Sequence, residues 1–337
     1  MKDLFDYYKE REQHTVELAT EAVEKQHELD NSEEDENSSE VSWSNLSHDE
    51  ERCKLLTGFI PSEFLTIYEI VSDDIKQNIG RGPRSKISKH DKLIIVLCYL
   101  KHYETIDKMK DTFSISRSHL HTILMTTIET ISPVLCEHYI ENLKDRVDDD
   151  DNNISYPNAK YVIDVTFQSI WTPIGTYDEK KRYYSGKHKL YGLKSQCIHD
   201  RKGRVVNCIA GEKGSMHDLT ICRENIDDLK NILNKENEED EDDNWVIIAD
   251  LAYKGLQDSV DVLLPHKKKP KKQLTKAQAK YNKELGAQRV ICERYYGRLK
   301  TRYRIMSSKY RNSRDEYSTI FNLCVALTNY NIILHPL

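Results

Sequence analysis

Hydrophobic and polar positions divide the chain into a helical first half and a mixed second half. In the first half, large apolar side chains become closely spaced near Leu55, and within residues 89–102 they recur at the 3.6-residue spacing of one helix face. Ser88 directly precedes this run, where a helix N-cap is expected. The predicted face consists of Leu93, Val96, Leu97 and Leu100.

A helix-turn-helix is predicted next. Residues 104–113 have the pattern of a short helix, residues 114–116 that of a tight turn, and residues 117–131 that of a helix that Pro133 ends. This order predicts a helix-turn-helix within about residues 88–132. The alternative is a helix pair that packs without touching DNA.

In the second half the spacing changes to that of β-strands. β-Branched residues at 161–165 predict a strand, and two further strands, at 191–199 and 205–209, flank a turn as in a hairpin. The later elements are a helical segment at 217–233, short buried strands at 245–249 and 262–264, and a long helix at 275–304. This succession predicts a mixed α/β domain.

Four regions follow from these patterns. Residues 29–51 have too few apolar side chains to offset the chain entropy that folding costs, so residues 1–54 are predicted to be largely disordered. The other regions are a helical domain at 55–147, an acidic linker at 148–157, and an α/β domain at 158–337 with an acidic insertion at 235–243.

The composition excludes several classes of protein. Hydrophobic residues make up 38% of the 337 and charged residues 31%, which excludes a wholly disordered or collagen-like chain. The longest apolar run, 93–100, is far shorter than the roughly 20 residues that span a bilayer. The eight cysteines include no CxxC or CxxH pair, which argues against a zinc site and a disulfide framework. We expect an intracellular protein without a secretory signal.

The net charge of −6 hides a strong segregation of charge along the chain. Residues 28–51 hold ten acidic side chains and no Lys or Arg, and residues 236–243 hold seven acids in eight positions. Residues 266–314, in contrast, hold seventeen Lys or Arg and two acids, a local charge of +15. This basic segment predicts binding of a polyanion, with a merely solvated basic surface as the alternative.

Three acidic residues stand out by their surroundings. Asp164 lies within an apolar strand, Asp250 ends another buried strand, and Glu293 is one of the two acids in the basic segment. A buried acid is costly unless it is paired or binds a metal, and Mg²⁺ prefers carboxylate oxygens. Two such ions about 4 Å apart would favour phosphoryl transfer. For each acid alone, helix capping or a salt bridge is the alternative.

The order of these acids and five sequence blocks resemble the DDE-superfamily transposases of the PIF/Harbinger type, relatives of bacterial insertion-sequence transposases. The blocks are YVIDVTF, YYSGKHKLYGLKSQ, GSMHDLTI, ADLAYKG and ICERYYGRLKTRYRIM. The resemblance runs from about Ser88 to the C-terminus. It implies a ribonuclease H-like catalytic domain in which Asp164, Asp250 and Glu293 hold two Mg²⁺ ions, with Mn²⁺ as a substitute. Asp218 is a further family position, with a metal-binding or a structural role.

Bacterial relatives also carry a Tyr-x2-Arg-x3-Glu-x6-Lys pattern around the catalytic Glu. Arg289, Glu293 and Lys300 fit this pattern, whereas Gly286 replaces the Tyr. Tyr191 and Gly192 stand where many relatives have His-Thr. The offsets of four and seven place both cations on the helix face of Glu293, where they would grip DNA phosphates.

The predicted DNA contacts come from the catalytic domain and from the second helix of the helix-turn-helix. That helix begins with polar side chains, as recognition helices do. The candidates are Arg289, Lys300, Arg294, Arg298, Lys187, Lys194, Arg117, Ser118, His119 and His121.

The sequence therefore predicts a metal-dependent DNA endonuclease and strand transferase that acts at transposon ends. The alternatives are a domesticated DNA-binding protein without nuclease activity and a nuclease that does not rejoin ends. The resemblance implies a homodimer or higher oligomer on DNA and a Myb-like companion protein. The segment HKKKPKK at 266–272 reads as a phosphate-gripping loop, a nuclear-import signal or both, so a nuclear location is expected.

Overall fold

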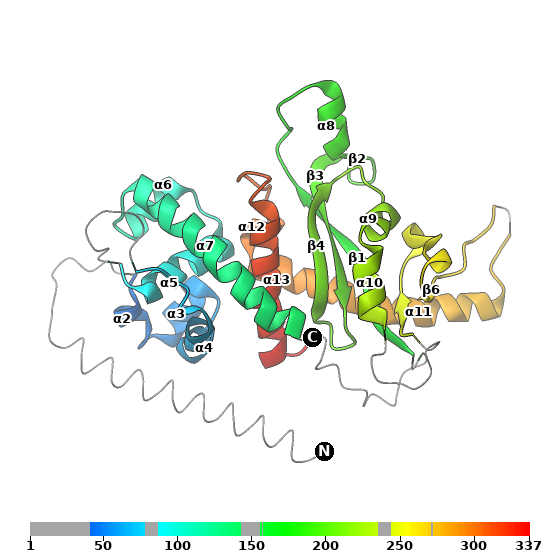
Figure 1. Cartoon of the computed structure of the whole chain (residues 1–337), viewed down its shortest axis with the longest axis horizontal. Coiled ribbons are helices and arrows are strands. Elements are labelled where there is room, and N and C mark those ends of the chain that lie inside the picture. The colour runs from blue at the N-terminus through cyan, green and yellow to red at the C-terminus, as the bar shows by residue number, and fades with distance from the viewer. Residues whose placement is uncertain (1–40, 78–86, 143–155, 157, 235–243, 271) are drawn as a thin grey trace, which may run out of the picture. The chain divides into compact units, whose positions relative to one another are not determined.

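The computed structural model describes residues 41–77, 87–142, 156, 158–234, 244–270 and 272–337 (Figure 1). Most of the predicted disordered region, nearly all of the acidic linker and the whole acidic insertion lie outside these residues. The chain forms two units, one of residues 1–134 and 302–305 and the other of residues 135–301 and 306–337. The division falls before the linker predicted at 148–157.

The regular elements in the described part of the first unit are helices. They are α2 (Trp43–Leu46), α3 (Glu50–Thr57), α4 (Pro61–Val71), α5 (Lys89–His102), α6 (Ile106–Thr112) and the greater part of α7 (Arg117–Tyr139).

The folded residues include a segment that the sequence pattern predicted to be disordered. Residues 41–54 were assigned to a disordered region, but Trp43, Leu46 and Cys53 are buried in the first unit. Asp49 caps α3 by accepting a hydrogen bond from the Arg52 backbone N–H, and Glu50 lies in the first turn. Acidic residues at a helix N-terminus are favoured by the helix dipole, so these acids stabilise a helix where their number alone suggested disorder.

Helix α5 has the predicted bounds and cap, but it is buried on every side. Ser88 accepts a hydrogen bond from the Asp91 backbone N–H. All residues from Lys92 to Leu100 are buried, and the Lys92 ammonium donates to the carbonyl oxygens of Lys76 and Gln77. A Lys with its hydrogen bonds satisfied by backbone oxygens can therefore occupy the interior of this unit.

Helix α7 continues past the residue that was predicted to stop it. The prediction ended the helix at residue 131 because a proline removes one backbone hydrogen bond, whereas α7 runs through Pro133 to Tyr139. Pro133 and Glu129 are exposed, so water can satisfy the carbonyl group that loses its helical partner. Ahead of α7, Ser114 adopts a left-handed φ of 52° in the predicted turn.

The second unit contains a mixed six-stranded sheet, which confirms the predicted α/β class. Strand β1 pairs antiparallel with β3 and parallel with β5, β3 pairs antiparallel with β4, and β5 pairs parallel with β6. The two-residue β2 pairs with the start of β3. The strands are β1 (Ala159–Ser169), β2 (Tyr184–Ser185), β3 (Leu190–His199), β4 (Val205–Lys213), β5 (Val246–Ile248) and β6 (Val262–Leu263).

Helices flank both faces of this sheet (Figure 1). On one face, α9 (Asp218–Glu224) and α10 (Ile226–Leu233) cover a core that includes Ile163 of β1. On the other face, α13 (Tyr317–Leu334) hydrogen-bonds to the sheet through Tyr317, and α11 (Lys276–Arg302) runs along β1. Side chains alternate along a strand, so Asp164 belongs to the α11 face. The shorter elements are α8 (Tyr177–Tyr183), α12 (Arg304–Ser307), η2 (Leu251–Tyr253) and η3 (Leu256–Asp258).

Two contacts each connect neighbouring segments of the second unit. In the β3–β4 turn, the buried Asp200 carboxylate accepts hydrogen bonds from Arg204 Nε at 2.7 Å and from the Arg204 backbone N–H at 2.8 Å. The residues that flank 235–243 lie side by side, since the Trp245 backbone N–H donates to the Leu233 carbonyl at 2.8 Å.

All eight cysteines are free. No helix among the described residues is long and apolar enough to cross a membrane.

Gly192, one of the two positions where the sequence departs from the expected family pattern, lies where the chain passes close to β1. A Cβ atom at this position would lie 2.2 Å from the Phe167 ring and 2.4 Å from the Gln168 carbonyl oxygen. The sheet therefore needs a glycine here, and the departure from the family pattern has a steric reason in this chain.

We expect Gly192→Ala to destabilise the protein by about 1–3 kcal/mol, the usual cost of forcing extra atoms into a packed site. Urea unfolding would measure this change. Gly186→Ala is the matched control, because no atom lies within 4 Å of the added Cβ. Equal unfolding midpoints for the two variants would contradict the steric explanation.

Candidate active site

Asp164 carries its carboxyl group in a largely enclosed place on the α11 face of the sheet. Its side chain is 26% exposed, and it lies opposite Cys197 in the strand register. Burial raises the pKa of Asp164 to about 6. A hydrogen bond with the Val165 backbone and the positive charge of Arg289 lower this pKa, and the negative charges of Asp250 and Asp218 raise it. The ionised form of this carboxyl group therefore depends on a nearby cation.

Asp250 reaches the same place from a neighbouring strand. It follows β5, which runs parallel to β1, and it caps η2 by accepting a hydrogen bond from the Ala252 backbone N–H at 2.8 Å. Parallel strands present their carboxyl ends at one edge of a sheet, where sites commonly form. The cap leaves Asp250 Oδ2 directed toward α11, as its contact with Arg289 shows.

Arg289 of α11 lies between the two aspartates. Its Nη2 atom is 3.9 Å from Asp164 Oδ1 and 3.9 Å from Asp250 Oδ2, and its side chain is 26% exposed. The sequence predicted a DNA contact for Arg289. In the structure its guanidinium is shared by the two carboxylates and offsets their charges.

The same face of α11 follows β1 for about three further turns, as far as Lys300. The Tyr296 hydroxyl donates to the Asp164 carbonyl oxygen at 3.0 Å, and the Lys300 ammonium donates to the Phe167 carbonyl oxygen at 3.4 Å. Burial lowers the pKa of Lys300. Sequence reasoning missed Tyr296, although its spacing of three from Glu293 places it on the same face.

Glu293 lies one turn after Arg289 on α11, and its side chain is exposed. Among the described residues, Glu293 does not share the Arg289 guanidinium with Asp164 and Asp250. Within the described part of the chain, no three His, Cys, Asp or Glu side chains form a group that could hold a metal ion. The structure thus brings together two of the three predicted acids.

Asp218 and Lys194 form a contact of their own on the α9 face. Lys194 Nζ lies 2.8 Å from Asp218 Oδ1 and 2.6 Å from the Met216 carbonyl oxygen, and both charged side chains are at most 22% exposed. Gln196 links the Asp218 carbonyl to the hydroxyl of Tyr253. Lys194, predicted to contact DNA, here neutralises Asp218 and fixes the start of α9.

The other predicted DNA contacts lie at the surface, some of them with protein partners. Arg298 donates to the carbonyl oxygens of His335 and Pro336. Arg117 pairs with Asp107 at 3.0 Å, with both side chains more than half exposed. The remaining candidates, which are exposed, are Arg294, Lys187, Ser118, His119 and His121.

A divalent cation fits the pair formed by Asp164 and Asp250. Both carboxylates already approach one positive group, and carboxylate oxygens are the ligands that Mg²⁺ and Mn²⁺ prefer. A metal ion at this pair would take over the charge compensation that Arg289 supplies. Glu293 could join as a third ligand only if its side chain turned toward the pair.

The raised pKa of Asp164 makes the stability of the metal-free protein depend on pH. Because the folded pKa, about 6, lies above the ordinary value of 3.8, folding becomes less favourable as the pH rises through this interval and stays level above it. Asp164→Asn cannot ionise, so we expect its stability relative to wild type to increase by on the order of 2 kcal/mol between pH of about 4 and 7. Urea unfolding with a chelator present would measure this. A constant difference across this range would contradict it.

A family model, a protein sequence and a solved structure relate the chain to known proteins. Residues 163–329 match the family model described as DDE superfamily endonuclease. Over 286 residues the chain is 26% identical to the "Probable transposase for insertion sequence element IS702" of Microchaete diplosiphon, which covers 84% of this chain and 95% of that protein. Among solved structures, the piggyBac transposase synaptic complex with hairpin DNA has a TM-score of 0.40 and 12% identity, with coverage of 84% of this chain and 75% of that one.

Proposed function

The chain belongs to the DDE superfamily of endonucleases and transposases, and we propose that it is a DNA transposase that uses divalent metal ions to cut and rejoin phosphodiester bonds at transposon ends. The observation that carries this proposal is the approach of Asp164 and Asp250, 86 positions apart in the sequence, to the same guanidinium. The mixed sheet with helices on both faces fits a ribonuclease H-like domain, which we propose for the second unit.

In this proposal Asp164, Asp250 and Glu293 would hold two Mg²⁺ or Mn²⁺ ions. When bound, the metal polarises the phosphoryl oxygens and offsets the charge that develops on them. The protein positions the ligands. Hydrogen bonds from Tyr296 and Lys300 hold α11 against the backbone of β1. They thereby fix the position of Glu293 along the strand relative to Asp164.

Arg289 has two partners in succession in this scheme. While the carboxylates have no metal, its guanidinium compensates their charge. If a cation occupied the carboxylates, the guanidinium would be available to bind a phosphate of the DNA, which suits its planar fork of donors.

The first unit supplies a second DNA contact in the proposal. Residues 88–132 act as a helix-turn-helix, with Arg117, Ser118, His119 and His121 exposed at the start of α7. The Arg117–Asp107 pair is exposed, and exposed pairs contribute only about 0–1 kcal/mol, so a DNA phosphate can compete for Arg117. A homodimer or larger oligomer on DNA, a Myb-like companion and a nuclear location complete the proposal.

The test is strand cleavage of DNA that carries the terminal repeats flanking the gene. We expect cleavage by the wild-type protein in Mg²⁺ and in Mn²⁺, none in EDTA, and joining of the freed 3′ ends to a second DNA. Free ends without joining would indicate a nuclease. Absence of cleavage in either metal, with or without a Myb-like companion, would overturn the proposal.

The second candidate function is a DNA-binding protein without nuclease activity. The exposed position of Glu293, apart from the aspartate pair, favours it. Tight binding of terminal-repeat DNA, together with no metal-dependent cleavage, would identify this function.

A further inference from the structure

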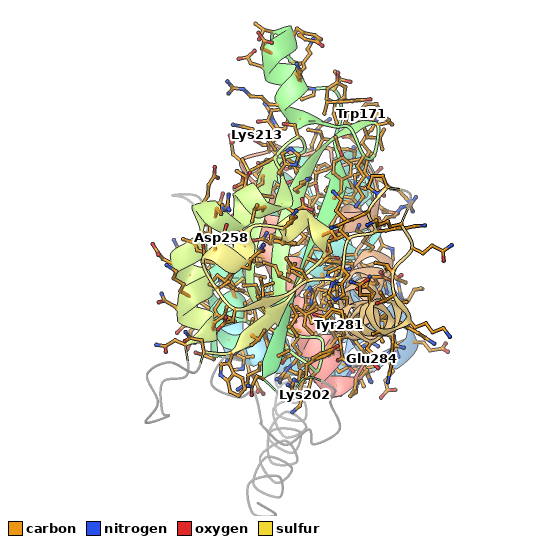
Figure 2. All side chains as sticks on the ribbon, turned by 90° about the vertical axis from the view of Figure 1, so that its right-hand side faces the viewer. Trp171, Lys202, Lys213, Asp258, Tyr281 and Glu284 are labelled. Carbon is orange, nitrogen blue, oxygen red and sulfur yellow. The ribbon has the colours of Figure 1, made fainter. Side chains whose placement is uncertain are left out.

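Exposed apolar side chains of the protein gather on one projecting segment of the second unit. Of the nine large hydrophobic side chains that are exposed among the described residues, five belong to residues 171–190. We call this segment, which includes α8 and the turn before β3, the arm. Figure 1 shows α8 beyond the end of the strands, and Figure 2 labels Trp171 at the base of this projection. The five are Trp171 (63% exposed), Ile174 (99%), Tyr177 (77%), Tyr184 (38%) and Leu190 (47%).

Cations surround these apolar side chains. The arm itself contains five Lys or Arg and two acids, and residues 309–314 beside it add three cations and no acid. This second segment is held at the base of the arm, since the Tyr310 backbone N–H donates to the carbonyl of Ser169, the last residue of β1. Lys309 Nζ lies 4.1 Å from the ring centre of Trp171, and the Arg314 guanidinium lies 4.6 Å from that of Tyr183.

The arm is anchored to the sheet at several points. Thr176 and Glu179 form a capping box at the start of α8, so one of the two acids is engaged within the arm. The His188 ring stacks on Phe167 of β1, with ring centres 4.3 Å apart. The Arg182 carbonyl accepts hydrogen bonds from the backbone and the side chain of Ser215. The exposed rings are therefore presented from a fixed base, which lowers the entropy cost of binding.

The arm also lies within reach of DNA held at the aspartate pair. It continues directly from β1, and the rise of about 3.3 Å per strand residue places Ser169 roughly 17 Å from Asp164. DNA advances about 3.4 Å per nucleotide along one strand, so the arm would meet the substrate roughly five to seven nucleotides from the scissile phosphate.

Exposed aromatic rings among cations suit a nucleic acid with unpaired bases. A paired duplex offers phosphates and groove edges, which bind the cations, but only unstacked bases offer the ring faces that stack on Trp or Tyr. We propose that the arm binds unpaired bases of a DNA strand next to the cleavage site, with Trp171 as the main stacking platform and the nearby Lys and Arg side chains on the phosphates. The proposal rests on the proposed function only in taking DNA as the substrate.

Intrinsic fluorescence offers a direct test, because the protein has three tryptophans and Trp43 is buried, whereas Trp171 is 63% exposed. The full-length protein would be titrated with a terminal-repeat duplex carrying a single-stranded overhang and with the same duplex fully paired, in equal salt and with EDTA present. We expect the overhang to quench the emission of Trp171 and to bind about tenfold more tightly than the paired duplex.

Variants then distinguish base stacking from electrostatic attraction and from a loss of folding. Trp171→Ala should lose about tenfold in affinity for the overhang DNA and less than about twofold for the paired duplex, whereas Trp171→Tyr should keep most of the preference. Trp245→Phe is the control that removes a tryptophan outside the arm, and thermal melting would verify that each variant folds.

Other results would overturn the proposal. One is equal binding of the two DNAs by wild type, and another is equal losses on both DNAs in Trp171→Ala. A third is a dimer that Trp171→Ala converts to monomers in sedimentation equilibrium while the overhang preference stays unchanged, because the arm would then be an interface between two copies. Cleavage by wild type without an overhang preference would refute the arm proposal and leave the proposed function intact.

Discussion

Asp164→Asn and Asp250→Asn are each expected to cut terminal-repeat DNA at least about 10³-fold more slowly than wild type. Each substitution removes one of the two carboxylate charges that approach the common cation position. Metal polarisation of a phosphoryl oxygen contributes several kcal/mol, and about 4 kcal/mol corresponds to 10³-fold in rate. Single-turnover cleavage in saturating Mg²⁺ would measure the loss, and a mobility-shift titration would verify that DNA binding is retained.

Asp258→Asn is the matched control for these variants. Asp258 belongs to the same unit but is exposed, with its side chain 74% accessible and 4.0 Å from Arg223. Its cleavage rate should stay within about twofold of wild type, as for most surface substitutions. Glu293→Gln tests the third ligand in the same assay. Cleavage by Asp164→Asn at the wild-type rate would refute the assignment of the aspartate pair.

Arg204→Met is expected to reduce the free energy of unfolding by about 3–5 kcal/mol, the usual cost of leaving one partner of a buried ion pair alone. Asp200 is fully buried and accepts two hydrogen bonds from Arg204. Burial raises the pKa of Asp200, and the Arg204 charge counteracts that rise. Without Arg204, keeping Asp200 ionised costs more, so the loss should be larger at pH of about 8 than at about 5. Urea unfolding at both pH values would measure it.

Two further variants serve as controls. Arg223→Met removes an exposed cation, 51% accessible, and should change stability by less than about 0.5 kcal/mol. The double variant Asp200→Asn with Arg204→Met should recover part of the loss, because it no longer buries an unpaired charge. If Arg204→Met and Arg223→Met unfolded at the same urea concentration, the Asp200–Arg204 pair would have no special role in stability.

Local sequence patterns predicted most elements of both units. β-Branched residues located the strand around Asp164, a short apolar run located the strand before Asp250, and Ser88 correctly predicted the start of α5. These features depend on neighbours within one turn or one strand, so the sequence contains the required information. The segments that the patterns misjudged, residues 41–54 and the end of α7, depend on packing and solvent access in the folded unit.

The contacts within the candidate site could not be predicted in this way. Arg289 meets Asp164 across 125 positions of sequence, and Lys194 meets Asp218 across 24. Periodicity placed Arg289 and Glu293 on one helix face, but it could not show which of them approaches β1. The packing of α11 on the sheet brings Arg289 to the aspartates and leaves Glu293 exposed.

The hydrogen bond between Leu233 and Trp245 also bears on how many residues can be inserted between these two positions. The two residues lie side by side, so the chain enters and leaves the intervening segment at neighbouring points. The entropy of closing a loop grows only slowly with its length. Additional residues at this point would therefore cost the folded unit little, and the segment offers a place to insert an epitope or a fluorophore-binding peptide while both ends of the chain stay native.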